Sequence, residues 1–451
     1  MKIKFLGAAE TVTGSKYLLE SNSGQKILVD CGLFQGTKNN REKNWAPLKV
    51  NPSEITDIIL THAHIDHSGY LPKITADGFR GFIHCTHATK ELANILLEDS
   101  AHLKEEEAHF ANKGGFSKHS PALPLYTKED VDKTLKLFRT HNFKEEFKIG
   151  DFSFKFYYAG HILGASSVLV TCDGKKIFFS GDLGRPNDLI MYDPHPPVSA
   201  DYWVVESTYG NRNHPATDPI EAIHQVVLKT LERNAVLLIP SFAVGRAQTI
   251  LYCLHEIFKK YPHINIPVYL NSPMSSKVTN IYLKLKDEHK LCEEDCRDIF
   301  SFVNFIETPE QSKALNLQSG PMIIISASGM ISGGRILHHL EAFGSDPNNI
   351  LMFVGFQAAG TRGANILQGE KNIKFHGHYH QINNEIINMD FFSAHAGQSE
   401  IMQWLNSAEE KPSMIFLTHG EPESADTLRL KIKDEIGVNT IVATENLEWN
   451  L

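Results

Sequence analysis

The feature that most constrains this chain is a group of four ligand-type side chains directly after an apolar segment. Ile58 to Leu60 end a predicted buried strand, and the turn that begins at Gly69 leads into a predicted helix. The histidines and the aspartate between them therefore lie at a strand terminus. Zn(II) binds imidazole nitrogens and carboxylate oxygens, and burying these groups without a metal would be costly. The residues are His62, His64, Asp66 and His67.

The spacing of this loop indicates two metal positions. In an extended backbone, residues two apart point to the same side, so we expect His62, His64 and Asp66 to converge, with His67 displaced toward a second position. The alternative is chance, since the chain has 23 histidines and three could gather on a solvated loop. A four-residue match of this kind arises by chance in under about one in a hundred chains of this length. We therefore predict a site for two adjacent ions.

Length and composition indicate a globular protein of more than one domain. With 451 residues, 42% hydrophobic and 22% charged, the chain can form two or three domains with separate cores. It has no run of eighteen apolar residues and no signal-peptide pattern, so we expect a cytoplasmic protein without membrane contact. The six cysteines are scattered, which favours reduced thiols. The formal net charge of −9 means that a polyanionic substrate would need a local basic patch.

The N-terminal segment is predicted to form short strands joined by polar turns, which indicates one sheet of a sandwich. Asp30 ends the third of these strands and is a candidate hydrogen-bond acceptor for a ligand imidazole, although it could instead cap the turn before Gly32. Further along, residues 90–109 predict a long helix, and the Gly-, Ser- and Pro-rich stretch 112–126 predicts a surface loop.

Three further candidate ligands end predicted strands beside glycines. His161 and Asp182 lie on either side of a predicted hairpin, and the glycine that precedes each one allows a close approach of the backbone. Asp182 is suited to bridge two ions, because a carboxylate can give one oxygen to each. His419 ends a later strand and is expected to bind the metal that Asp66, His67 and Asp182 share.

Residues 209–383 have a different character, because predicted strands and helices alternate there. This alternation indicates a parallel sheet with loops at the carboxyl ends of its strands, and hence a second, α/β domain. Loops rich in Gly and Ser open several of the helices, and such loops bind phosphate through N–H groups and arginines, although they serve packing about as often. The candidate substrate-binding residues are Arg246, Ser328, Ser332, Gly333, Arg335 and Arg362.

Taken together, these motifs resemble the β-CASP branch of the metallo-β-lactamase superfamily, whose members are nucleases that process nucleic acids. The H-x-H-x-D-H loop, the later Gly-His and Ser-Gly-Asp segments and the α/β insert carry the resemblance, which runs from end to end of the chain and includes residues 329–335 and 355–363. It implies a metallo-β-lactamase αββα sandwich over residues 1–208 and 384–451, with an inserted β-CASP domain over residues 209–383.

The resemblance implies a zinc-dependent ribonuclease that holds two Zn(II) ions per chain and cleaves single-stranded RNA. Glu206 at a strand end and His395 in a Ser-Ala-His segment match further motifs of the branch, and with Asp66 they form the expected catalytic set, His395 being the general acid. His419 stands where RNA-acting members have His and DNA-acting members have Val. The implied ligands are His62, His64, His161 and Asp182 for one ion, and Asp66, His67, Asp182 and His419 for the other.

Other functions compete with this interpretation. A small-substrate hydrolase such as a thioesterase uses the same metal loop but does not need the insert with its arginine-bearing loops. A catalytically dead scaffold should have lost ligands, and all of them are present. A DNA-acting nuclease of the same branch is disfavoured by His419. The sequence leaves open whether cleavage is endo- or exonucleolytic, which RNA is cut, and whether the protein forms a homodimer.

Overall fold

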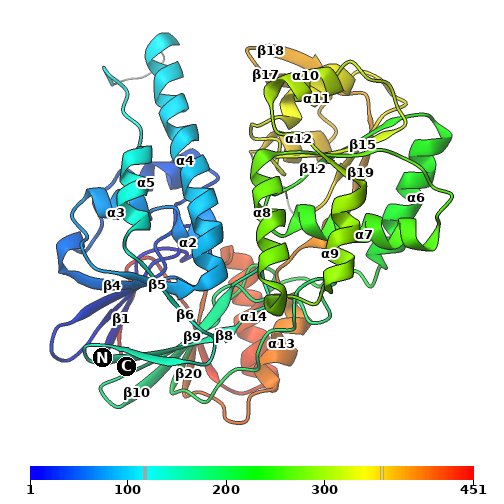
Figure 1. The fold of residues 1–451 in the computed structure, drawn as a ribbon. Coiled ribbons are helices and arrows are strands. Elements are labelled where there is room, and N and C mark those ends of the chain that lie inside the picture. Colours follow the sequence, from blue (N-terminus) through cyan, green and yellow to red (C-terminus); the bar gives the residue numbers. More distant parts are fainter. Residues whose placement is uncertain (115–118, 356, 359) are drawn as a thin grey trace. The chain divides into compact units, whose positions relative to one another are not determined.

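The computed structural model describes residues 1–114, 119–355, 357–358 and 360–451. Parts of the predicted loop 112–126 and of the segment 355–363 therefore lie outside the described residues. The chain divides into two compact units, each of which is described by itself (Figure 1). None of the described helices is long and apolar enough to cross a membrane. The first unit comprises Met1–Asn213 and His395–Leu451, and the second comprises His214–Ala394.

The first unit contains two seven-stranded sheets. In the first sheet, which has the order β22-β1-β2-β3-β4-β5-β6, the strands β3 to β6 pair in parallel and the others pair antiparallel. Its strands are β1 (Lys2–Phe5), β2 (Tyr17–Glu20), β3 (Lys26–Val29), β4 (Ile55–Ile59), β5 (Ile83–Thr86), β6 (Phe138–His141) and β22 (Glu448–Asn450).

Helices cover the outer face of this sheet (Figure 1). The longest of them, α4, contacts β5 and β6. It spans residues 87–114, so the helix predicted over residues 90–109 is confirmed. Two of the others, α3 and α5, pack against each other. The helices of this layer and of the loops beside it are α1 (Lys38–Lys43), α2 (Ile65–Ser68), α3 (Leu71–Ala76), α4 (His87–Gly114) and α5 (Lys128–Leu135).

The second sheet has the order β21-β20-β11-β10-β9-β8-β7. The predicted hairpin joins β9 to β10, and its turn residues Asp173 and Gly174 both have positive φ, as a tight type I′ turn requires. The strands are β7 (Glu146–Ile149), β8 (Phe152–Tyr158), β9 (Ser166–Cys172), β10 (Lys175–Phe179), β11 (Tyr202–Glu206), β20 (Met414–Thr418) and β21 (Asn439–Val442).

Alternation along the strands builds two cores. In β10, Phe179 packs with Phe5 of the first sheet, whereas the neighbouring Phe178 points to the opposite face. On that opposite face Ile401 of α13 (Gln398–Asn406) and Leu428 of α14 (Pro422–Glu435) pack against the sheet. The first unit is thus two sheets with helices on both outer faces, and the predicted αββα sandwich is confirmed.

The second unit is an α/β domain with a six-stranded sheet in the order β14-β13-β15-β12-β16-β19, and every strand pair is parallel, as predicted. Strand β19 pairs with β16, so this sheet extends past residue 383. The strands are β12 (Val236–Pro240), β13 (Val268–Asn271), β14 (Val303–Phe305), β15 (Met322–Ser326), β16 (Ile350–Phe353) and β19 (Glu385–Asn388), with a separate hairpin of β17 (Asn372–Phe375) and β18 (His378–Gln381).

The helices of the second unit alternate with its strands, beginning with α6 before β12, as the sequence predicts for an α/β domain. The first of them, α6, begins after Asp218, whose side chain accepts hydrogen bonds from two backbone N–H groups of the first turn. The helices are α6 (Pro219–Glu232), α7 (Arg246–Lys260), α8 (Pro273–Lys284), α9 (Glu293–Phe302), α10 (Pro309–Leu315), α11 (Ile336–Phe343) and α12 (Arg362–Leu367).

Candidate metal centre

Strand direction gathers the candidate residues of the first unit at one edge of its second sheet. The strands β8, β10, β11 and β20 all run in the same direction, because β9 pairs antiparallel with both β8 and β10 while β10, β11 and β20 pair in parallel. Their carboxyl ends therefore meet at the same edge. There His161 follows β8, Asp182 follows β10, Glu206 ends β11 and His419 follows β20.

The metal-ligand loop after β4 does not stay extended. The short helix α2 begins directly after His64, and the backbone N–H of His67 donates to the carbonyl of His64 at 2.9 Å. Our expectation that Asp66 converges with His62 and His64 is therefore wrong. A helix turns its side chains by about 100° per residue, so Asp66 lies with His67 instead.

The backbone of α2 is held by the chain that follows β3 and by the segment before β2. Ser15 N donates to Asp66 O at 2.9 Å, and Cys31 N donates to His67 O at 2.7 Å. At Gly32 the two segments approach so closely that a Cβ atom would lie 1.6 Å from Asp66 O. Only glycine fits there, and this close contact fixes the position of the ligand-bearing turn.

The first cluster consists of three histidines and Asp182, whose ligand atoms all lie within 4.8 Å of one another. The Nε2 atoms of His62 and His161 are 3.5 and 3.6 Å from Asp182 Oδ2. The third imidazole, His64, places Nδ1 3.2 Å from His161 Nε2. Ligands that stand about 2.0–2.2 Å from a tetrahedral zinc are about 3.4 Å apart, so these separations suit a shared ion.

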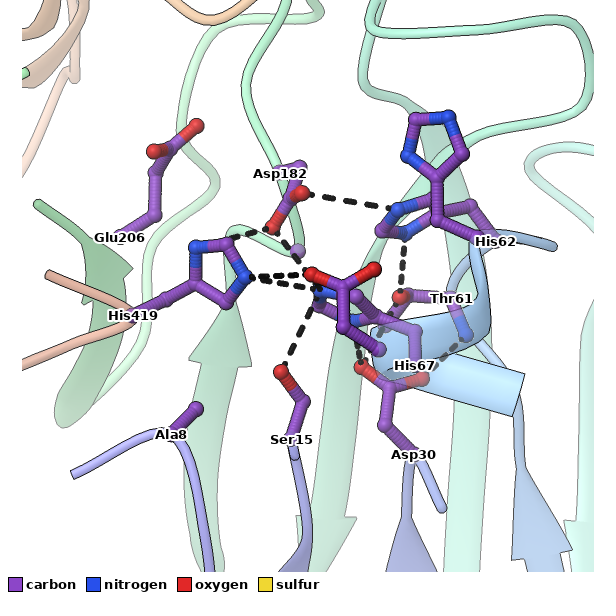
Figure 2. A network of polar contacts seen from close by, with 12 residues as sticks. Ala8, Ser15, Asp30, Thr61, His62, His67, Asp182, Glu206 and His419 are labelled. Carbon is purple, nitrogen blue, oxygen red and sulfur yellow. Dashed lines mark hydrogen bonds and ion pairs between the residues drawn. The ribbon is translucent and has the colours of Figure 1, made fainter. Parts of the chain in front are cut away.

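The second cluster contains Asp66, His67 and His419. The Nε2 atom of His419 is 3.2 Å from Asp66 Oδ2 and 3.2 Å from His67 Nε2. Asp182 reaches this cluster too, because its Oδ1 lies 3.2 Å from His67 Nε2. Figure 2 shows the dashed contacts of Asp182 running to rings of both clusters. The bridging position that the sequence assigns to Asp182 is thus available in the structure.

Several buried polar atoms of these clusters have no hydrogen-bond partner, namely His62 Nε2, His161 Nδ1 and Asp182 Oδ1. A buried polar atom left unpaired costs about 1–3 kcal/mol, so this arrangement needs a further binding partner. Burial also lowers the pKa of His62 and His161 well below the usual value, which keeps these rings neutral, and only a neutral imidazole can ligate a metal. The donor set therefore fits divalent metal ions.

The charge of Asp182 follows from its neighbours. Burial acts to raise its pKa, but the imidazoles of His419 and His67 outweigh burial and hold the pKa well below the usual value. The side chain is 2% exposed, and it is therefore an ionised carboxylate inside the protein. Such a group is stable only with cations around it, which protonated histidines or bound metal ions can supply.

Side chains outside the two clusters orient the ligand rings. Asp30 accepts a hydrogen bond from His67 Nδ1 at 2.8 Å, which confirms the predicted acceptor role of Asp30. Thr208 Oγ1 lies 3.0 Å from His419 Nδ1, and sequence reasoning missed this contact. The signal was present, since Thr208 comes two residues after the end of β11, next to the site. Fixing one ring nitrogen in this way directs the other toward the metal.

Glu206 and His395 form a pair beside the clusters. His395 Nδ1 lies 3.1 and 3.2 Å from the two carboxylate oxygens of Glu206, which is 1% exposed. Burial acts to lower the pKa of His395, but the Glu206 carboxylate outweighs it and raises the pKa to about 9. The other ring nitrogen, Nε2, lies 4.0 Å from Asp182 Oδ2 and thus on the metal side. The geometry joins the two residues as the sequence interpretation expected.

The candidate phosphate-binding loops of the second unit have a different geometry. The hydroxyl of Ser328 accepts hydrogen bonds from the backbone N–H groups of Ser332 and Gly333, so these donors point into their own loop. Arg335 donates to Asn271 Oδ1 and to the carbonyls of residues 306 and 307. Arg362 donates to the carbonyls of residues 331, 332 and 374. These side chains bind the loops together.

Arg246 differs from the other two arginines in its place in the fold. It is the first residue of α7, directly after Gly245, whose φ is +78°. Its guanidinium lies 5.7 Å from the centre of the Phe392 ring and close to Gly355. The phosphate-binding role of Arg246 and of the other five candidates stays a prediction.

A two-sheet sandwich with histidine and aspartate clusters at its strand ends defines a metal-dependent hydrolase. Three domain families match the sequence. The metallo-β-lactamase superfamily matches residues 11–234, the Beta-Casp domain matches residues 247–366, and the Zn-dependent metallo-hydrolase RNA specificity domain matches residues 379–443.

Relatives match nearly the whole chain. A ribonuclease of Thermus thermophilus, TTHA0252, is 37% identical over 433 residues, 94% of each chain. The transcription termination factor FttA of Methanosarcina mazei is 31% identical over 99% of this chain and 71% of its own. The Drosophila melanogaster cleavage and polyadenylation specificity factor 73 is 28% identical over 96% of this chain and 62% of its own. This chain belongs to the β-CASP branch of the metallo-β-lactamase superfamily.

A solved structure supports the fold alone. A protein of unknown function from Enterococcus faecalis V583 aligns with 100% of this chain and 99% of its own, with a TM-score of 0.57 and 14% identity.

Proposed function

We propose that this protein hydrolyses phosphodiester bonds of single-stranded RNA with two zinc ions bound in its first unit. The observation that carries the proposal is the pair of ligand clusters joined by Asp182, beside the Glu206–His395 pair. Relatives named as ribonucleases, and a matching domain described by its RNA specificity, support RNA as the substrate class. His419 occupies the position that the sequence resemblance associates with RNA.

The two ions would be held by the side chains that the sequence identified. His62, His64, His161 and Asp182 would hold the first, and Asp66, His67 and His419 would hold the second together with Asp182. Paired divalent cations of this kind activate water near neutral pH and neutralise the charge that develops on a phosphate.

His395 is proposed to donate the proton that the leaving oxygen needs. Its contact with Glu206 holds the ring in place and favours the protonated form, and its Nε2 lies on the side of Asp182. A proton donor fixed in this way contributes about 10² to 10⁴ in rate. Glu206 is itself fixed, because it accepts a hydrogen bond from the backbone N–H of Leu183 at 2.7 Å.

The exposure of the site favours an unpaired strand. His62, Asp182 and His419 are at most 3% exposed, whereas the side chains of Asp66 and His395 are 19% and 20% exposed. A substrate phosphate would therefore approach along the side of Asp66 and His395. A single strand can bend its backbone toward a recessed group, whereas a duplex holds its phosphates on a stiff, wide cylinder.

The test compares three end-labelled substrates at one salt concentration: a single-stranded RNA, a DNA of the same sequence, and an RNA hairpin of the same composition. The zinc-loaded protein is expected to cut the unpaired RNA and to spare the DNA and the hairpin stem. Cutting of DNA at an equal rate would favour a general nuclease. Cleavage inside the stem would contradict the single-strand preference, and no cleavage of any substrate by protein with its full metal content would contradict the proposed function.

A further inference from the structure

A separate group of ligand-type side chains lies within the second unit. His255 and Glu256 belong to α7, and Asp295 belongs to α9, which packs against α7 (Figure 1). One ligand atom of each residue lies within 4.8 Å of the others. The proposed nuclease mechanism uses none of these residues.

The imidazole of His255 is buried and faces two carboxylates. The residue is 4% exposed, and its Nε2 is a buried atom without a hydrogen-bond partner. This nitrogen lies 3.5 Å from Glu256 Oε1 and 3.6 Å from Asp295 Oδ1. The carboxylates are partly exposed, by 31% and 21%, so an ion from solvent can reach the group. A buried nitrogen aimed at two anions without bonding to either of them calls for a cation between them.

The distances separate this cluster from a hydrogen-bonded pair of imidazole and carboxylate. Where an imidazole of this protein hydrogen-bonds a buried carboxylate, the atoms are closer, as in the 2.8 Å contact of His67 Nδ1 with Asp30. The separations at His255 are too long for that. They match the 3.5 Å between His62 Nε2 and Asp182 Oδ2 in the metal centre. Two ligands about 2.0–2.2 Å from one zinc ion stand about 3.4 Å apart.

Similar distances also occur on the protein surface, where they have a simpler cause. His102 and Glu106 on α4 are 3.6 Å apart, but each side chain is about half exposed, at 49% and 50%, so solvent reaches both groups. His255 is buried and meets two carboxylates. The Asp295 carboxyl is held in place, because its Oδ2 accepts a hydrogen bond from the backbone N–H of Cys292 at 3.0 Å while its Oδ1 lies 3.6 Å from His255 Nε2.

We propose that His255, Glu256 and Asp295 bind a divalent cation of the zinc class, which ties α7 to α9. One imidazole and two carboxylates form a mixed nitrogen and oxygen set that suits Zn(II) or Mn(II) better than Mg(II) or Ca(II), which prefer oxygen ligands alone. With three protein ligands, water completes the coordination on the exposed side. The site is independent of the nuclease function proposed above.

The test counts zinc per chain by elemental analysis after equilibrium dialysis against a fixed free Zn(II) concentration. The variants are His255→Gln and Glu256→Gln, and the control is Asp298→Asn, an exposed carboxylate on α9 outside the cluster. We expect each cluster variant to bind one ion fewer than the wild-type protein and the control. Equal zinc in all four proteins would overturn the proposal.

Glu256→Gln decides the result if His255→Gln does not fold, because Glu256 is partly exposed and its amide analogue keeps the shape of the side chain. The measured quantity is a difference between proteins, so it does not depend on how many ions the first unit holds. Failure of the nuclease proposal would therefore leave this result unchanged, and the two proposals can fail separately.

Discussion

The candidate metal centre of the first unit and the arginine loops of the second unit were predicted by the same kind of reasoning, from residues that follow strands. In the first unit the predicted residues point at one another, and buried atoms such as His62 Nε2 lack a hydrogen-bond partner. In the second unit the donors of Arg335 and Arg362 point at backbone carbonyls of neighbouring loops. Placement at a strand end is therefore not enough, and what each polar atom already binds decides whether it can take a ligand.

The largest effect is expected in the first unit. His64→Ala should lose metal and activity together, because even partners outside the ligand set change metal affinity by about 10- to 100-fold, and a ligand should matter more. Metal content and RNA cleavage measure the two effects. The control is His102→Ala, an exposed histidine on α4, which should change neither. Full activity in His64→Ala would show that His64 is not a metal ligand.

The Glu206–His395 pair should separate chemistry from metal binding. Glu206→Gln and His395→Ala are expected to keep their metal while turnover falls by about 10² to 10⁴. Glu206→Gln should also move the fall in activity at alkaline pH to a lower pH, because the carboxylate raises the pKa of His395. Elemental analysis and a pH profile provide the two readouts. Loss of metal in either variant would make that residue part of the metal site rather than a proton donor.

A smaller effect is expected from the acceptor behind His67. Asp30→Asn keeps the size of the side chain but weakens its bond to His67 Nδ1, so metal affinity should fall by about 10- to 100-fold. Titration with a competing chelator measures this change. Asp201→Asn is the matched control, because Asp201 directly precedes β11, at the opposite end of this strand from Glu206, and its carboxylate accepts a hydrogen bond from Lys176 N. Equal affinities in the two variants would mean that Asp30 acts only on the fold of its turn.

The arginine loops should show the smallest effects, and these effects should differ in kind. Arg246→Ala is expected to reduce the slope of log RNA affinity against log salt concentration by about 0.7. This is the contribution of one phosphate contact to the binding of a single strand. Arg362→Ala should leave that slope unchanged and destabilise the fold by about 2 kcal/mol, through loss of its hydrogen bonds to backbone carbonyls. Binding titrations and thermal unfolding separate the two. An equal change of slope in both variants would support a phosphate contact of Arg362.

The sequence predicted the strands, the hairpin and the parallel sheet, because each follows from local patterns of apolar, turn and glycine residues. It predicted the residues of the candidate metal centre because they follow strands whose carboxyl ends meet at one sheet edge. It did not predict how the chain turns after His64, where the short helix α2 (Ile65–Ser68) moves Asp66 to the side of His67. It also missed contacts between distant segments. The approach of His255 to Asp295 depends on how α7 packs against α9, and no spacing in the sequence records such packing.

The most direct test of the account is the number of metal ions lost when Asp182 is changed to Asn. If Asp182 joins the two clusters, Asp182→Asn should bind two fewer zinc ions per chain than the wild-type protein, while His395→Ala binds as many as the wild type. Because the measured quantity is the difference in zinc content between variant and wild-type protein, an ion held by α7 and α9 does not affect it. A loss of one ion or none in Asp182→Asn would contradict the shared two-metal centre on which the proposed mechanism depends.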